Sequence, residues 1–404
     1  MVKKESEKRR NHVCVLAGAA LFQLALVGVL INSNGVLLTQ LRTEYGFSMT
    51  RISAFNMLRC ISGAVLAPVY SSLFFRYDKA KTMFGSVVLI ACGYLLLIIG
   101  ADTWLWYLAP CFMSCTTSIG VFAISYVVRP WFPQSYGTAS GFAMAFSGVG
   151  GVVFSPVIAQ LIVLLGWRWA VIIMGAVMLV TASTGLWLLF RRSPELVYGE
   201  SGPAQMKKTK PNGKKFLFHK FFLCILCLMG AAFCLQLVSY INLYAQSIGY
   251  SLVAGAALTS FVMGGNIIGK LIYGVSCDWF GVWKTTSACS LLVAAGVWLT
   301  VLAPGSYPAM CIGAVLLGFA YSISTLALSR CCIAAYGAAE SARYVGIHSG
   351  INSALGALVS MGSGLLYDKI HTFVPVFAAG AVITMVSAIT AAAMSIKESG
   401  RRRK

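Results

Sequence analysis

The sequence predicts an all-α membrane protein with twelve transmembrane helices in two similar six-helix bundles. Of its 404 residues, 58% are hydrophobic and only 10% are charged, whereas soluble domains carry about 25% charged residues. The apolar residues form long continuous runs, and about 20 such residues cross the hydrocarbon core as a helix. These runs are too long for the short alternating strands of a membrane barrel. The composition therefore excludes a soluble enzyme, a disordered tail protein and a nucleic-acid-binding domain.

Twelve apolar runs follow one another along the chain, and each predicts one span. They cover residues 13–38, 49–74, 82–100, 104–128, 138–165, 168–190, 217–246, 251–276, 284–303, 307–329, 344–366 and 373–396. The spans leave five regions: a basic N-terminus (1–12), an N-terminal bundle (13–190), a polar linker (191–216), a C-terminal bundle (217–396) and a basic tail (397–404).

The basic residues predict the orientation of these spans. The chain has 31 Lys and Arg against 11 Asp and Glu, a net charge of +20. Most of the basic residues fall in the termini, the linker and the loops of one side, which the positive-inside rule places in the cytoplasm. The first apolar run is too long for a cleaved signal peptide. We therefore expect a multi-pass plasma-membrane protein with both termini cytoplasmic, monomeric in the bilayer and without cofactor or metal.

The two halves of the chain resemble each other. The end of the second predicted span (71–78) is similar to the end of the eighth (274–281), and glycines of the fifth span recur in the eleventh. Two similar halves joined by a basic linker imply a pseudo-twofold axis along the membrane normal, an arrangement in which the halves can rock about a central site. The glycines would let neighbouring helices approach closely.

A signature loop follows the eighth span. Its residues Gly274, Asp278, Gly281 and Lys284 resemble the signature of the major facilitator superfamily of transporters, and a degraded copy after the second span keeps Arg76. The resemblance implies the facilitator fold and alternating access. It further implies that these residues act as a conformational latch, in which Asp278 holds the two halves together in the outward-facing state.

A narrower resemblance lies in Arg129-Pro130-Trp131-Phe132-Pro133 and the glycine-rich stretch that follows it. This region is similar to the oxalate:formate antiporters and monocarboxylate porters. Lys270 stands where those antiporters carry an essential Arg, whereas Asn352 stands where they carry an essential Lys. His348 lies one turn before Asn352 on the same helical face. The resemblance implies a carboxylate substrate, and the departure at Asn352 argues against oxalate itself.

Three ionisable residues fall inside spans, and all of them can be cationic: Arg59, Lys270 and His348. All eleven carboxylates fall in loops, tails or helix ends. A cation at membrane depth costs about 2.5–3.5 kcal/mol. A transported organic anion would supply the missing charge, or backbone carbonyls, water and snorkelling would satisfy the cations. The candidate substrate-binding residues are Arg59, Lys270, His348, Asn352 and Tyr240.

The charge pattern predicts transport of a small organic anion, with exchange favoured over proton symport. Proton relays use membrane Asp or Glu, and here only His348 could titrate. A proton-coupled monocarboxylate symporter, a broad drug-efflux pump and a non-transporting receptor remain alternatives. An enzyme is not expected. The run 264–270 fits GxxxxGK, but Leu271 replaces the magnesium-binding hydroxyl and the run lies inside a span.

Overall fold

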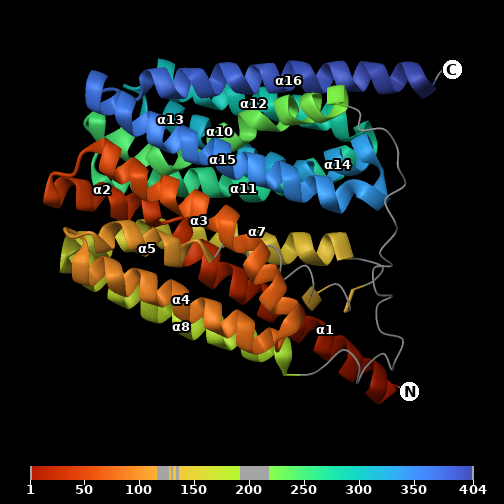
Figure 1. Cartoon of the computed structure of the whole chain (residues 1–404), viewed down its shortest axis with the longest axis horizontal. Coiled ribbons are helices and arrows are strands. Elements are labelled where there is room, and N and C mark those ends of the chain that lie inside the picture. Colours follow the sequence, from red (N-terminus) through yellow and green to blue (C-terminus); the bar gives the residue numbers. More distant parts are fainter. Residues whose placement is uncertain (1, 116–126, 129–130, 133–135, 192–217, 403–404) are drawn as a thin grey trace. The chain divides into compact units, whose positions relative to one another are not determined.

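The computed structural model describes residues 2–115, 127–128, 131–132, 136–191 and 218–402, and all regular elements among them are helices (Figure 1). The all-α prediction is confirmed. All but the first residue of the predicted linker 191–216 and the centre of the predicted span 104–128 lie outside the described residues.

The helices follow the predicted spans closely. The N-terminal part contains α1 (Val2–Gln23), η1 (Leu24–Ile31), α2 (Asn34–Tyr45), α3 (Met49–Arg76), α4 (Lys79–Gly100), α5 (Leu105–Met113), α7 (Tyr136–Leu165) and α8 (Trp167–Phe190). The C-terminal part contains α10 (Phe218–Ser247), α11 (Leu252–Phe280), α12 (Val282–Leu302), α13 (Tyr307–Ser322), η2 (Ile323–Ala327), α14 (Leu328–Tyr336), α15 (Ala338–Ile370) and α16 (Val374–Arg402).

Nine segments of the described chain have both the length and the hydropathy of a membrane span. One of them joins α1, η1 and α2, and another joins α13, η2 and α14, because π-helical segments interrupt these two spans. The helices α3 and α15 are long enough, with 28 and 33 residues, but they are more polar. With the partly described fourth span, the arrangement agrees with the twelve predicted helices.

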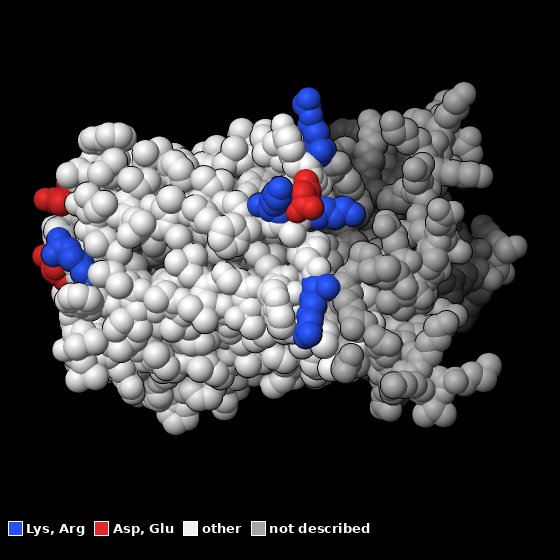
Figure 2. Space-filling view, turned by 90° about the horizontal axis from the view of Figure 1, so that it is seen from below, with Lys and Arg blue, Asp and Glu red and all other residues white. Residues whose placement is uncertain are grey.

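The outward-facing side chains fit an apolar solvent. Large hydrophobic residues on several helices are exposed, among them Val65, Leu164 and Ile389 at 64–76%. On the face shown in Figure 2, the charged side chains gather in two groups that a broad uncharged surface separates. An uncharged band between charged rims is what a bilayer-spanning protein presents to lipid.

The chain forms two compact units. The first contains Met1–Leu41 and Leu58–Lys208, and the second contains Arg42–Met57 and Thr209–Lys404. The boundary therefore falls inside the continuous helix α3: its first turns pack with the second unit, and the rest belongs to the first.

Backbone turns repeat at the predicted spacing between the halves. Gly46 and Gly249 both have positive φ (62° and 96°) where the first helices of each half end. Gly166 (φ 81°), after α7, corresponds in position to His371 (φ 53°), after α15. His371 is the only described non-glycine residue with positive φ. At the ends of the signature loops, Asp78 caps α4 by accepting from the Lys81 amide at 2.9 Å, and its counterpart Gly281 caps α12. Both residue types suit a helix N-cap, so Asp78 can occupy the position in the degraded copy that Gly281 occupies in the signature loop.

Glycines bring helices of the first unit together. A Cβ atom on Gly18 would lie 2.8 Å from the Gly185 carbonyl oxygen, between α1 and α8. A Cβ on Gly28 would lie 2.7 Å from the Gly150 Cα, between η1 and α7. Among the glycines that recur between the fifth and eleventh predicted spans, Cβ atoms on Gly141 and Gly346 would meet no atom within 4 Å in the described residues.

The first turn of α3 is capped from α15. Asp368 accepts from the Met49 amide (2.8 Å), the Thr50 amide (2.8 Å) and the Thr50 hydroxyl (2.6 Å). Arg42 lies over the Tyr367 ring at 5.0 Å beside this cap. A carboxylate at a helix N-terminus satisfies amides that have no intrahelical acceptor and interacts with the helix dipole. The Asp368 carboxylate therefore ties α15 to the 42–57 segment.

We expect Asp368→Ala to lower the stability of the folded protein by about 1–2 kcal/mol, because it removes a helix cap. Partial burial would raise the pKa of Asp368, but the hydrogen bonds from Thr50 and Met49 hold its pKa below the usual value. A depressed pKa contributes stability above the unfolded pKa of about 3.9, and that stability disappears as the pH falls through the folded pKa. Melting curves in detergent should show the difference at neutral pH and its loss in acid, with Asp368→Asn intermediate. A difference that does not change with pH would contradict this assignment.

Candidate functional site

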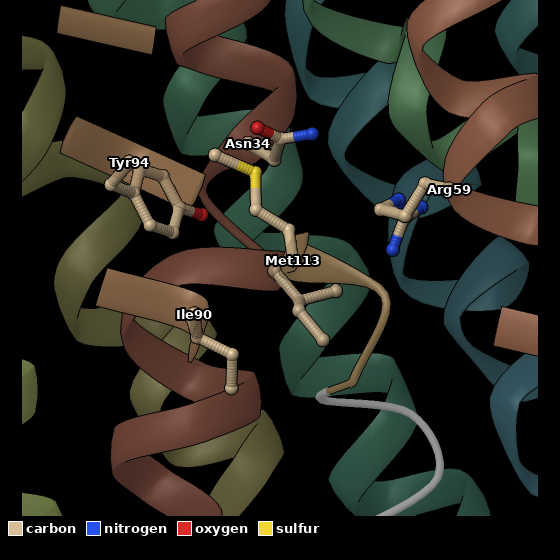
Figure 3. A pocket seen from close by; sticks show the side chains of 6 residues that line it. Asn34, Arg59, Ile90, Tyr94 and Met113 are labelled. Carbon is tan, nitrogen blue, oxygen red and sulfur yellow. The ribbon is translucent and has the colours of Figure 1, made fainter. Parts of the chain in front are cut away.

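A hollow in the first unit surrounds Arg59. Its lining comes from five helical segments, η1, α2, α3, α4 and α5. The lining residues are Ile31, Asn34, Arg59, Ile90, Tyr94 and Met113. Figure 3 shows Arg59 on one side of this space, with Tyr94 and Ile90 on the opposite side. The hollow therefore combines a guanidinium, an amide and a phenol with an apolar wall.

Two polar atoms of this hollow have no hydrogen-bond partner in the described part of the chain. Arg59 Nε and Asn34 Oδ1 are buried without a hydrogen-bond partner among the described residues. Tyr94 is 6% exposed and lines the same hollow as Arg59. No carboxylate is among the lining residues. A half-buried guanidinium without a counter-ion is costly at membrane depth, so the site has the chemistry of an anion receptor.

Lys270 occupies a comparable position in the second unit. It lies on α11, is partly buried, and has no hydrogen bond or ion pair to any described residue. One turn earlier, the amide of Asn266 is 1% exposed, and its Oδ1 has no partner within the described chain. Each unit thus carries one membrane cation that the described protein atoms do not neutralise.

His348 lies in an aromatic cluster on the second unit. Its side chain is 1% exposed, and its Nε2 lies 3.1 Å from the Tyr336 hydroxyl. The Phe221 ring packs against the imidazole at 5.1 Å, and Tyr336 stacks on Tyr344 at 3.8 Å. Asn352, one turn further along α15, is partly buried. The cluster connects α10, α14 and α15.

Tyr240 is fully buried on α10 and its hydroxyl already has partners. The hydroxyl lies 3.0 Å from Ser53 Oγ and 3.2 Å from the Ser360 carbonyl oxygen. Its ring stacks on Phe373 at 5.8 Å. The contact with Ser53 is a second link, besides the Asp368 cap, between the first turns of α3 and the C-terminal helices.

The signature-loop residues lie at helix ends. Asp278 pairs with Arg330 of α14 at 2.9 Å, with 70% of the Asp278 side chain exposed. Gly281 has φ 85° at the junction of α11 and α12. Gly274 has open space around it, whereas Lys284 and Arg76 are exposed. An exposed ion pair contributes about 0–1 kcal/mol, so this contact can form and break at little cost.

The stretch predicted from the narrower resemblance is only partly described. Residues 129–130 and 133 lie outside the described chain. Trp131 is 1% exposed, and His12 Nε2 lies 3.0 Å from its carbonyl oxygen. The described part of the chain contains no group of three His, Cys, Asp or Glu residues that could hold a metal ion.

Sequence reasoning found Arg59 but missed Asn34 and Tyr94. A signal for Asn34 was present: Asn32, Ser33 and Asn34 are three consecutive polar residues in the middle of an otherwise apolar span. Tyr94 had no comparable signal, because a single tyrosine in an apolar helix is ordinary.

Solved structures with the same fold belong to transporters. A nucleoside transporter, NupG, superposes with a TM-score of 0.72 at 13% identity, covering 95% of this chain and 99% of that one. A bacterial homologue of the human lysosomal transporter Spinster gives 0.70 at 17% identity, covering 96% and 97%. A bacterial homologue of the human peptide transporters PepT1 and PepT2 gives 0.67 at 14%, covering 97% and 100%. At these identities the likeness concerns the fold.

Two curated relatives are also transporters. The chain is 27% identical over 238 residues to the uncharacterized transporter ESBP6 of Saccharomyces cerevisiae, over 57% of this chain and 35% of that protein. It is 24% identical over 234 residues to the MFS-type transporter pynF of Aspergillus niger, over 57% and 51%. The matched region thus spans about half or less of these relatives.

The family model named Major Facilitator Superfamily matches residues 20–289. This range covers more than half of the chain and includes both the Arg59 hollow and the signature loop after α11. The chain therefore belongs to the major facilitator superfamily, and its long apolar helices are those of a multi-pass membrane protein.

Proposed function

We propose that this transporter carries a small organic anion, a carboxylate, across the plasma membrane by alternating access. The observation that carries the proposal is Arg59, whose Nε is buried without a partner beside a hollow that no carboxylate lines. A planar guanidinium matches a carboxylate through two parallel hydrogen bonds. The substrate would supply the negative charge that the described residues of the hollow do not.

Lys270 is the proposed second cation. It contributes a compact positive charge from α11 in the other unit, whereas the planar guanidinium of Arg59 offers two parallel N–H donors. The resemblance at Lys270 to the oxalate:formate antiporters and monocarboxylate porters supports a carboxylate. His348 and Asn352 would belong to the same half of the path, with Tyr240 shaping it from α10.

Exchange of one anion for another is the proposed mode. An empty site leaves its cations uncompensated, which disfavours reorientation until an anion binds. Asp278, Gly274, Gly281, Lys284 and Arg76 would then act as the conformational latch at the cytoplasmic ends, where both termini lie. The low cost of breaking the exposed Asp278–Arg330 pair is compatible with a contact that is remade in each cycle.

Counterflow in proteoliposomes tests this function. Vesicles that contain the purified monomer and an unlabelled anion should accumulate the labelled anion faster than empty vesicles, and Lys270→Gln should reduce that uptake. The panel is oxalate, formate, lactate, pyruvate and an aromatic acid. A cationic drug and a pH gradient are the comparison arms. Uptake that requires a pH gradient would overturn exchange, and saturable uptake of the drug alone would overturn the anion assignment.

A further inference from the structure

The first membrane span is broken at its centre. The π-helical η1 ends at Ile31, a turn follows at Asn32 and Ser33, and α2 begins at Asn34. The three polar residues at this break are all buried: Asn32 is 6% exposed, Ser33 1% and Asn34 7%. A break of this kind at membrane depth places backbone and side-chain polar groups where water is scarce.

The break is held in place but its polar atoms are not satisfied. The side-chain Nδ2 of Asn32 donates to the Ser147 carbonyl of α7 at 2.8 Å. Gly28 packs directly on Gly150, which also lies on α7. In contrast, Asn32 Oδ1, Ser33 Oγ and Asn34 Oδ1 have no hydrogen-bond partner among the described residues. An unsatisfied buried polar group costs about 1–3 kcal/mol. Three in succession make packing alone a poor explanation for the break.

The break faces the hollow that contains Arg59. Ile31 and Asn34, on either side of the turn, both line it, and Figure 3 shows Asn34 at this position. Asn34 is also the first residue of α2, a helix of 12 residues. A helix start carries partial positive charge and amides without intrahelical acceptors, which suits an anion. The hollow therefore receives positive potential from two sources, the guanidinium and the helix start.

Asn34 adds a requirement that a simple anion does not meet. Its unpartnered atom is the carbonyl oxygen Oδ1, an acceptor, so it is satisfied by a donor on the ligand. The lining also includes the apolar side chains of Ile90 and Met113. A short-chain carboxylate with a hydroxyl near the charged group presents all three features: an anion, a donor and a small apolar remainder.

We propose that the broken first span forms the substrate subsite. The start of α2 and Arg59 hold the carboxylate, and Asn34 selects anions that carry a neighbouring hydroxyl. This inference rests on the proposed anion transport and adds the element that recognises the substrate. A site that hydrogen-bonds a hydroxyl penalises the analogue that lacks it, because the buried acceptor is then left unpaired.

Competition between two matched anions tests the subsite. Lactate and propionate differ by one hydroxyl, and each is used to inhibit labelled anion uptake by the wild type, Asn34→Leu and Thr39→Val. The wild type should prefer lactate by about tenfold, as expected for one buried hydrogen bond. Asn34→Leu should bind the two equally. Thr39→Val is the control on the same helix, since Thr39 is buried, donates to the Gly35 carbonyl at 2.7 Å and is not part of the lining; it should keep the preference.

A second variant covers the case in which Asn34→Leu does not fold. Asn34→Asp keeps the size and places a carboxylate beside Arg59, so it should lower the uptake of both anions at least tenfold. Equal inhibition by lactate and propionate in the wild type, an unchanged preference in Asn34→Leu, or full uptake by Asn34→Asp would each overturn the subsite. Anion uptake that survives Arg59→Gln would instead overturn the proposed function, so the two failures are distinguishable.

Discussion

Arg59→Gln is expected to abolish anion uptake while leaving the empty protein folded. Removing one partner of a desolvated, charged hydrogen-bonded pair costs about 2–5 kcal/mol, which is roughly thirtyfold to several-thousandfold in affinity. Glutamine keeps a polar group of similar reach but has neither the positive charge nor the two parallel N–H donors of the guanidinium. Arg59→Lys keeps the positive charge without the two parallel N–H donors, so it should retain only part of the uptake.

The stability of the same variant separates binding from folding. In the absence of substrate, the buried guanidinium is a cost, so Arg59→Gln should melt no lower than the wild type. Added substrate should raise the melting temperature of the wild type and leave the variant unchanged, because a ligand stabilises only the state that binds it. This measurement does not depend on transport.

Arg51→Gln is the matched control for charge. Arg51 lies on the same helix, α3, its guanidinium packs over the Phe47 ring at 3.8 Å, and it is not among the lining residues of the hollow. The substitution removes the same charge, and we expect nearly normal uptake. Equal losses in Arg59→Gln and Arg51→Gln would show that net positive charge, and not the Arg59 site, attracts the anion.

Gly265→Ala is expected to produce the largest loss of stability among conservative changes. A Cβ atom on Gly265 would fall on the Val315 carbonyl oxygen, and a Cβ on Gly318 would fall on the Val262 carbonyl oxygen. The two glycines therefore let α11 and α13 cross in direct backbone contact. A methyl group must push the helices apart, and backbone carbonyls cannot turn away as a flexible side chain can. Overpacking of this kind costs about 1–3 kcal/mol or more.

The neighbouring glycine provides the control. A Cβ on Gly264 would meet no atom of the described chain within 4 Å, and alanine is the better helix former. Gly264→Ala should therefore melt at or slightly above the wild-type temperature, whereas Gly265→Ala should melt lower and yield less folded protein in size-exclusion chromatography. Similar melting curves for the two variants would contradict the close crossing of α11 and α13.

Arg59 and Asn34 show how far the site could be predicted. Arg59 was predictable because a cation in an apolar span is chemically exceptional wherever its neighbours lie. Asn34 was not singled out, although it stands 25 positions earlier in a run of three polar residues. Asparagines in a span usually bond to neighbouring helices. Asn32 does so, through Ser147, whereas Asn34 Oδ1 has no such partner in the described chain.

Tyr240 and His348 are the opposite case, because the sequence singled them out and the structure surrounds them with protein partners. Both were candidates because polar aromatic residues in spans can line a substrate path. In the structure, the Tyr240 hydroxyl bonds to Ser53 and Ser360, and the His348 imidazole lies against Tyr336 and Phe221. Their assignment to the substrate path stays a prediction.

The sequence by itself determined that this protein spans a membrane as helices, which family it resembles and where the unmatched cations lie along the chain. Hydropathy and charge settle these features because each depends on one segment and its solvent. Only the tertiary structure decided that the first span breaks beside Arg59, that Asp368 caps α3 from α15, and that Gly265 tolerates no methyl group while Gly264 does. These features depend on which atoms of distant segments meet, and the helical period specifies the faces of a helix without specifying the neighbour that covers each face.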